Sequence, residues 1–172
     1  MGFKHFRAVA IYGDTVVVGA KWDDDDGDKS GSAYIFEKPS TGWADMNETA
    51  KLTADDPDTG DLFGTGVAID GETVVIGAEG DDDNGSTSGS VYVFEKEAGW
   101  ITGSSNQVAK LTASDGAAWD RLGHSVAIYG DTVVAGAKDH DVHGAAYVFE
   151  KPGADWSDRT ENAKLILQRK VG

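Results

Sequence analysis

The feature that most constrains this chain of 172 residues is an internal repeat, because one sequence block occurs three times. The block reads Val-Ala-Ile-x-Gly, an acidic residue, Thr-Val-Val-x-Gly-Ala. It begins at Val9, Val67 and Val126, so successive copies start 58 and 59 residues apart. A repeat at this spacing predicts a set of equivalent structural units that stack on one another.

Two further blocks recur in the same order. A Tyr-hydrophobic-Phe-Glu-Lys block ends each of the ranges 33–38, 91–96 and 146–151. A Trp followed by Ala-Lys-Leu closes each unit, with the tryptophans at Trp43, Trp100 and Trp156. Because they repeat in register, these tryptophans are expected to pack between neighbouring units.

Each unit is predicted to form four β-strands. In the first unit, residues 9–11 and 15–18 flank Tyr12-Gly13-Asp14, and a Gly beside an Asp between two β-rich runs predicts a hairpin. The third strand, residues 33–37, carries apolar groups on both faces, so both faces must be covered. The fourth runs from the Trp towards Lys51-Leu52-Thr53 and is polar enough to form the outer edge.

Sheets of four strands that are apolar on both faces favour a β-propeller over a sandwich, in which one face of each sheet is wet. We therefore predict an all-β fold with three propeller blades of four antiparallel strands in a single domain. The blades are expected to span about residues 1–58, 59–117 and 118–172.

The composition excludes several classes of partner. With 15 basic and 30 acidic side chains the formal charge is −15, which disfavours binding to nucleic acid and to anionic lipid surfaces. No apolar stretch is long enough to insert into a membrane. The apolar run 8–12 is shorter than the core of a signal peptide, about 7 to 15 residues, so no secretion signal is visible. The absence of Cys excludes disulfides and thiolate metal sites.

The units resemble the FG-GAP repeat, the blade of the integrin α-subunit propeller and of many bacterial surface and secreted proteins. Phe63-Gly64 and Gly77-Ala78 in the second unit match the two motifs that name the repeat, and Leu122-Gly123 with Gly136-Ala137 match them in the third. The first unit is degenerate, with residues 4–6 in place of the Phe-Gly pair. The resemblance implies a non-enzymatic module that binds protein or carbohydrate in an extracellular or cell-surface setting.

The resemblance also bears on metal binding. In the integrin-type blade, a calcium cage lies in the loop that joins the first two strands, but here that loop has shrunk to short turns at Gly13, Gly71 and Gly130. Three residues cannot surround one ion with about six oxygens, so we predict no calcium cage in these hairpins. We expect no other cofactor.

Acidic residues gather instead in the next loop of each unit, over residues 23–28, 81–85 and 139–144. Counting back from Gly27 and Gly85, the first position of a calcium loop lacks an oxygen ligand. One interpretation is a solvated, turn-forming loop. The other is weak calcium binding driven by the clustered charge. The candidate ligands for it are Asp24, Asp26, Asp82 and Asp83.

No catalytic constellation is visible in the sequence. His124 lacks a Ser or Cys partner motif, and His140 and His143 are interpreted as surface residues because their loop is not repeated. The alternative function is a polysaccharide-active hydrolase or lyase, which would need acids or His that break the repeat symmetry. Trp22 and Trp119 also fall outside the repeat, so they are better candidates for exposed contacts than the repeated tryptophans, but the favoured interpretation is packing for these two as well.

Three blades cannot close a ring, because propellers have about four to eight. The terminal blades should therefore show apolar residues on bare outward faces. We expect Val9, Ile11, Val17 and Ile35 on one face and Val133 and Val148 on the other. Two chains joined head to tail would make six blades about one two-fold axis, so we predict a homodimeric ring. A truncated larger propeller and another oligomer are the alternatives.

Overall fold

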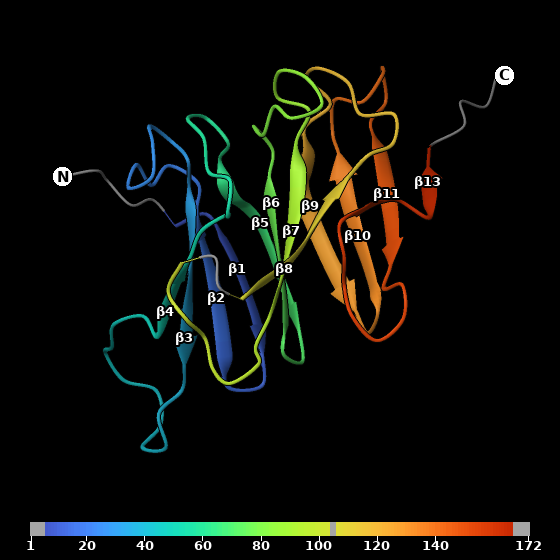
Figure 1. The fold of residues 1–172 in the computed structure, drawn as a ribbon. Helices are drawn as coiled ribbons and strands as arrows, with labels where there is room; N and C mark the ends of the chain where they lie inside the picture. Colours follow the sequence, from blue (N-terminus) through green and yellow to red (C-terminus); the bar gives the residue numbers. More distant parts are fainter. Residues whose placement is uncertain (1–5, 104–105, 167–172) are drawn as a thin grey trace, which may run out of the picture.

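The computed structural model describes residues 6–103 and 106–166 and shows three sheets side by side, each of which we call a blade (Figure 1). Blade 1 contains β1 Ala8–Tyr12, β2 Thr15–Ala20, β3 Ser32–Glu37 and β4 Ala50–Leu52. Blade 2 contains β5 Phe63–Asp70, β6 Thr73–Ala78, β7 Ser90–Glu95 and β8 Gln107–Thr112. Blade 3 contains β9 Leu122–Tyr129, β10 Thr132–Ala137, β11 Ala145–Glu150 and β13 Ala163–Leu165. No helix in the described ranges has the length and apolarity needed to cross a membrane.

The predicted four-stranded antiparallel unit is confirmed in all three copies. In blade 1 the first hairpin closes between Tyr12 and Thr15, and Gly13 takes a φ of +55° in the turn. This conformation suits Gly because it has no Cβ to clash with the backbone. The equivalent turns at Gly71 and Gly130 have φ values of +60° and +54°.

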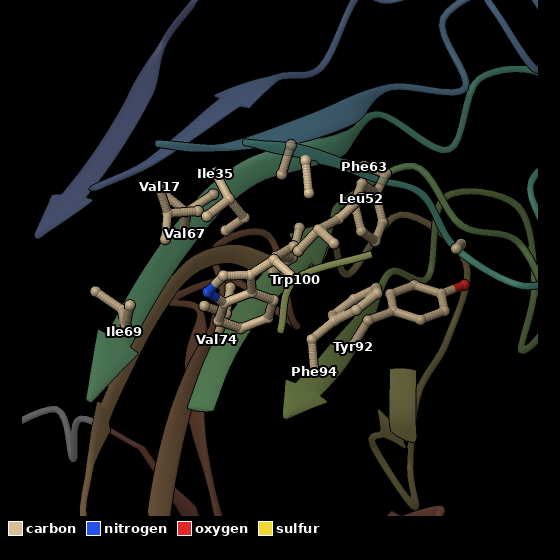
Figure 2. Close-up of a cluster of buried hydrophobic side chains, with 14 of the residues drawn as sticks. Val17, Ile35, Leu52, Phe63, Val67, Ile69, Val74, Tyr92, Phe94 and Trp100 are labelled. Atoms are coloured by element: carbon tan, nitrogen blue, oxygen red, sulfur yellow. The ribbon is translucent and has the colours of Figure 1, made fainter. Parts of the chain in front are cut away.

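The blades stack through two apolar clusters, one on each side of blade 2. In the first, Val17 and Ile35 of blade 1 meet Val67 and Val74 of blade 2, with the Trp100 ring lying among them (Figure 2). In Figure 1, blade 1 (blue) and blade 3 (orange) consequently lie on opposite sides of blade 2 (green).

The expectation that Val17, Ile35 and Val133 lie on bare faces is wrong, because all three are fully buried against blade 2. Successive side chains of a strand point to opposite faces, so the choice of face depends on which blade is the neighbour. The expectation is confirmed for Val9 and Ile11, which are 73% and 64% exposed, whereas Val148 is half-buried.

The fourth strands of blades 1 and 2 are each covered by a segment of the next unit. β12, Arg159–Thr160, pairs in parallel with β8 of blade 2, so the fourth strand of blade 2 is not its outermost strand. Gly103 likewise bridges Leu52 of β4. This covering satisfies backbone groups that an edge strand would leave unpaired.

The same covering segments carry the repeated tryptophans. Trp100 and Trp156 are buried between blades, as predicted. Trp43 is 47% exposed, so the prediction of interblade packing is wrong for that residue. Its segment precedes β4 of blade 1, and within residues 6–103 and 106–166 no blade lies before blade 1 for Trp43 to pack on.

The Phe-Gly and Gly-Ala motifs meet where two blades approach most closely. A Cβ added to Gly77 of β6 would come within 1.9 Å of the Gly123 carbonyl oxygen of β9. A Cβ on Gly19 would come within 2.1 Å of the Gly64 oxygen in the same way. The two motifs therefore allow backbone-to-backbone contact between neighbouring blades.

Candidate functional site

The loop between the second and third strands of blade 2 forms a cluster of carboxylates around one lysine. Asp81 begins the loop, is buried, and accepts hydrogen bonds from Ser90 Oγ at 2.9 Å and Tyr92 Oη at 2.8 Å. Lys110 Nζ lies 2.9 Å from Asp81 Oδ2 and 2.7 Å from Asp56 Oδ2, and it also binds Asp83. Within the described residues, these three aspartates are the group whose carboxylates lie close enough to hold one metal ion.

The lysine ammonium provides the positive charge that these carboxylates need. Burial alone would lower the pKa of Lys110, but its hydrogen bonds to Asp56, Asp83 and Asp81 outweigh burial and raise that pKa above the usual range. For Asp56 the directions are reversed. Burial alone would raise the pKa of this carboxyl, but the hydrogen bonds from Lys110 and Tyr92 outweigh burial and lower that pKa. Calcium would have to displace this ammonium, so the cluster is built as a charged hydrogen-bond network.

The structure places the four predicted metal ligands in different environments. Asp83 contacts Lys110, whereas the exposed Asp24 accepts the backbone N–H of Lys29 at 2.9 Å. Asp26 and Asp82 are exposed. Their binding of a cation stays a prediction. The sequence analysis did not single out Asp81 or its counterpart Asp23 as site residues. The signal that could have found them is that both follow the Gly-Ala motif at the same distance.

Blade 3 replaces the buried aspartate of this site with His140. The prediction that His140 is a surface residue is wrong, because it is buried and its Nδ1 lies 2.8 Å from Asp120 Oδ2. Lys164, the counterpart of Lys110, contacts the ring and lies 2.6 Å from Asp115 Oδ2. His143, three residues after His140, is exposed, as predicted. These contacts make His140 part of the hydrogen-bond network of its loop.

A second charged site joins all three blades at the residue after Gly-Ala. Glu79 is buried, and its carboxylate lies 2.7 Å from Lys21 Nζ of blade 1 and 3.0 Å from Lys138 Nζ of blade 3. His124 Nδ1 lies 2.7 Å from the same carboxylate. Burial would raise the pKa of Glu79, but the hydrogen bonds to Lys21, His124 and Lys138 outweigh burial and hold this pKa at about 2. The signal for this site in the sequence is that the residue after the Gly-Ala motif is Lys in the first unit, Glu in the second and Lys in the third.

The two tryptophans outside the repeat have different surroundings. The Arg7 guanidinium lies 4.4 Å from the centroid of the Trp22 ring. Trp119 is 58% exposed in the connection between blades 2 and 3, with a φ of +74°. Trp119 is therefore available for contact.

The outward faces of the two terminal blades carry exposed apolar side chains. On blade 1, Phe6 is exposed beside Val9 and Ile11. On blade 3, Leu165 and Ile166 are exposed beside a cavity of about 360 Å³. The cavity is lined by Ala137, Lys138, His143, Gly144, Ala145, Ala146, Leu165 and Ile166.

The sequence family is decided by a direct comparison. A family model of the FG-GAP repeat matches residues 6–36, 46–94 and 105–149, which is well over half of the chain. The chain belongs to the FG-GAP repeat family. Among curated proteins, no relative matches it.

The comparison with solved structures agrees on the fold. The WD40 β-propeller domain of Doa1 is similar with a TM-score of 0.52 at 14% identity, over 87% of this chain and 38% of that one. The FG-GAP chain thus spans well under half the length of that propeller and has the β-propeller fold, with three blades among the described residues. The computationally designed Ika4 protein has a TM-score of 0.43 at 18% identity, over 86% of this chain and 91% of that one.

Proposed function

We propose that this FG-GAP chain is a non-enzymatic propeller module for protein or carbohydrate binding that completes its ring by self-association. The observation that carries the proposal is the repetition of interface residues on the open faces. Val9 and Ile11, exposed on blade 1, are the counterparts of Val67 and Ile69, which are buried against blade 1 in blade 2. Leu165 of blade 3 is the counterpart of Leu111, which is buried against blade 3.

The two open faces therefore carry complementary halves of an interface that the chain already forms twice. Contiguous apolar side chains exposed to water mark a surface that associates with another protein surface. Two chains joined head to tail would supply six blades, within the range that propellers close, with blade 3 of each chain against blade 1 of the other. A closed ring would also create the central depression in which propellers bind ligands.

The test is the mass in solution, measured by light scattering after size exclusion over a hundredfold range of concentration. A mass near twice 18.1 kDa supports the ring, and a stable mass near 18.1 kDa refutes it. A glycan array and a turnover screen on polysaccharides then address ligand binding. Binding without turnover supports a module, whereas turnover would point to the hydrolase or lyase alternative.

A further inference from the structure

We propose that the cavity on blade 3 is a socket for the side chain of Phe6 from a second copy of this chain. The inference rests on the proposed self-association and names a side-chain contact that would set how the two copies join. It is supported by the chain itself, in which two equivalent sockets are already filled by apolar side chains.

The first filled socket lies between blades 1 and 2. Phe63 is 1% exposed, forms a parallel bridge with Gly31, and donates its N–H to the Ser30 carbonyl at 2.9 Å. The second lies between blades 2 and 3, where Leu122 bridges Gly89 and donates its N–H to Ser88 at 2.9 Å. In both cases a large apolar side chain enters from the following blade.

The cavity on blade 3 is lined by the third set of these residues. Ala137, Gly144 and Leu165 line it, and they stand in the repeat where blade 1 has Ala20, Gly31 and Leu52. Among the described residues, Gly144 has no bridging partner of the kind that Gly31 and Gly89 have. The part of the chain that the structure describes has no fourth blade to fill this socket.

Phe6 lies one position later in the repeat than Phe63, in register with Gly64, but it shares one ring contact with the residue that fills the first socket. Its ring packs edge-on against Tyr34 with centroids 6.0 Å apart, as Phe63 packs against Tyr92 at 5.4 Å. Tyr34 and Tyr92 are equivalent in the repeat. Phe6 differs in being 57% exposed, because no preceding blade covers it. Phe6 precedes β1 of blade 1 and the cavity is lined by residues of blade 3, and these two blades lie on opposite sides of blade 2 (Figure 1).

Charge complementarity favours the same arrangement. Lys151 of blade 3 binds Glu95 of blade 2 at 2.8 Å, and Lys96 of blade 2 binds Glu37 of blade 1. The counterparts of these residues in the repeat are Lys38 of blade 1 and Glu150 of blade 3; both are exposed, and Lys38 binds Asp14 of its own blade at 3.1 Å within the chain. When Phe6 enters the socket of a second copy, Lys38 approaches Glu150 of that copy and the series is complete.

The first experiment compares the dimer dissociation constants of the wild type, Phe6→Ala and Trp119→Ala by sedimentation. Trp119 is a matched control, since it is 58% exposed and lies outside the open faces. Phe6→Ala is expected to weaken association at least about 30-fold, as removal of a central anchor does. Trp119→Ala is expected to leave it unchanged.

The second experiment is a charge exchange that does not depend on the effect of Phe6→Ala on folding. Lys38→Glu and Glu150→Lys should each weaken the dimer about tenfold, and the double variant should restore it. A wild type that stays monomeric overturns the ring itself. A wild-type dimer that survives Phe6→Ala and both charge variants overturns only the socket and places the interface elsewhere.

Discussion

The substitution Gly77→Ala tests the close approach of neighbouring blades. The added Cβ would lie 1.9 Å from the Gly123 carbonyl oxygen, whereas ordinary contact begins at 3.4 Å, so β6 and β9 must separate by about 1.5 Å. Both clashing groups are anchored on backbone and cannot turn aside. Overpacking of this kind costs about 1 to 3 kcal/mol, and we expect the upper end, about 3 kcal/mol. Lower entropy of the unfolded chain offsets up to about 1 kcal/mol, which leaves a net loss of about 2 kcal/mol.

Gly136→Ala is the matched control, because Gly136 has the same place in β10 but no following blade. Its added Cβ would meet the Ser125 Oγ at 2.6 Å, and that side chain can rotate. We therefore expect a change within about 0.5 kcal/mol of zero. Both variants are measured by urea unfolding in a Phe6→Ala background, so that association does not contribute to the transition.

The expected fall in Tm for Gly77→Ala is about 4 to 8 °C for a domain of this size. Equal stability of the two variants would contradict the reasoning, and so would a Gly77→Ala protein as stable as its parent. Either result would mean that the blades can separate without losing the packing between β6 and β9.

Three further predictions follow from buried side chains and charges. Trp100→Ala should lower the free energy of unfolding by about 3 to 5 kcal/mol, and the exposed Trp43→Ala should change it by less than about 1, both by urea unfolding in the same background. Because the folded pKa of Glu79 lies at about 2, below its ordinary 4.5, its stabilisation is present above pH 4.5 and is lost as the pH falls towards 2. Glu79→Gln should thus be less stable than the wild type at pH 7, with the difference shrinking towards pH 2, and a constant difference would contradict this. Calorimetry should show calcium binding to the wild type no tighter than about 100 μM, lost in a variant with both Asp24→Asn and Asp26→Asn, and Lys110→Met should gain calcium binding because it frees Asp56, Asp81 and Asp83. A tight wild-type site would refute the view that the lysine serves as the cation.

Much of the fold could be predicted from the sequence because it depends on local patterns. The Gly-Asp turns, the β-rich runs and the repeat spacing each restrict a few adjacent residues, and three copies reinforce one another. These patterns suffice for the strands, the hairpins and the three blades. The apolar residues on both faces of the third strand also showed that each blade needs neighbours.

The tertiary structure alone decided which face of each strand meets which neighbour, and therefore what the terminal blades leave open. Val17 and Val9 look alike in sequence, but Val17 faces blade 2 and Val9 faces outward. Asp81, Asp56 and Lys110 come from three separate parts of the chain, so only folding brings their charges together. The proposal that Phe6 occupies the blade 3 cavity of a second copy likewise depends on the positions of Phe63 and Leu122, because long-range packing sets these positions and no local pattern encodes them.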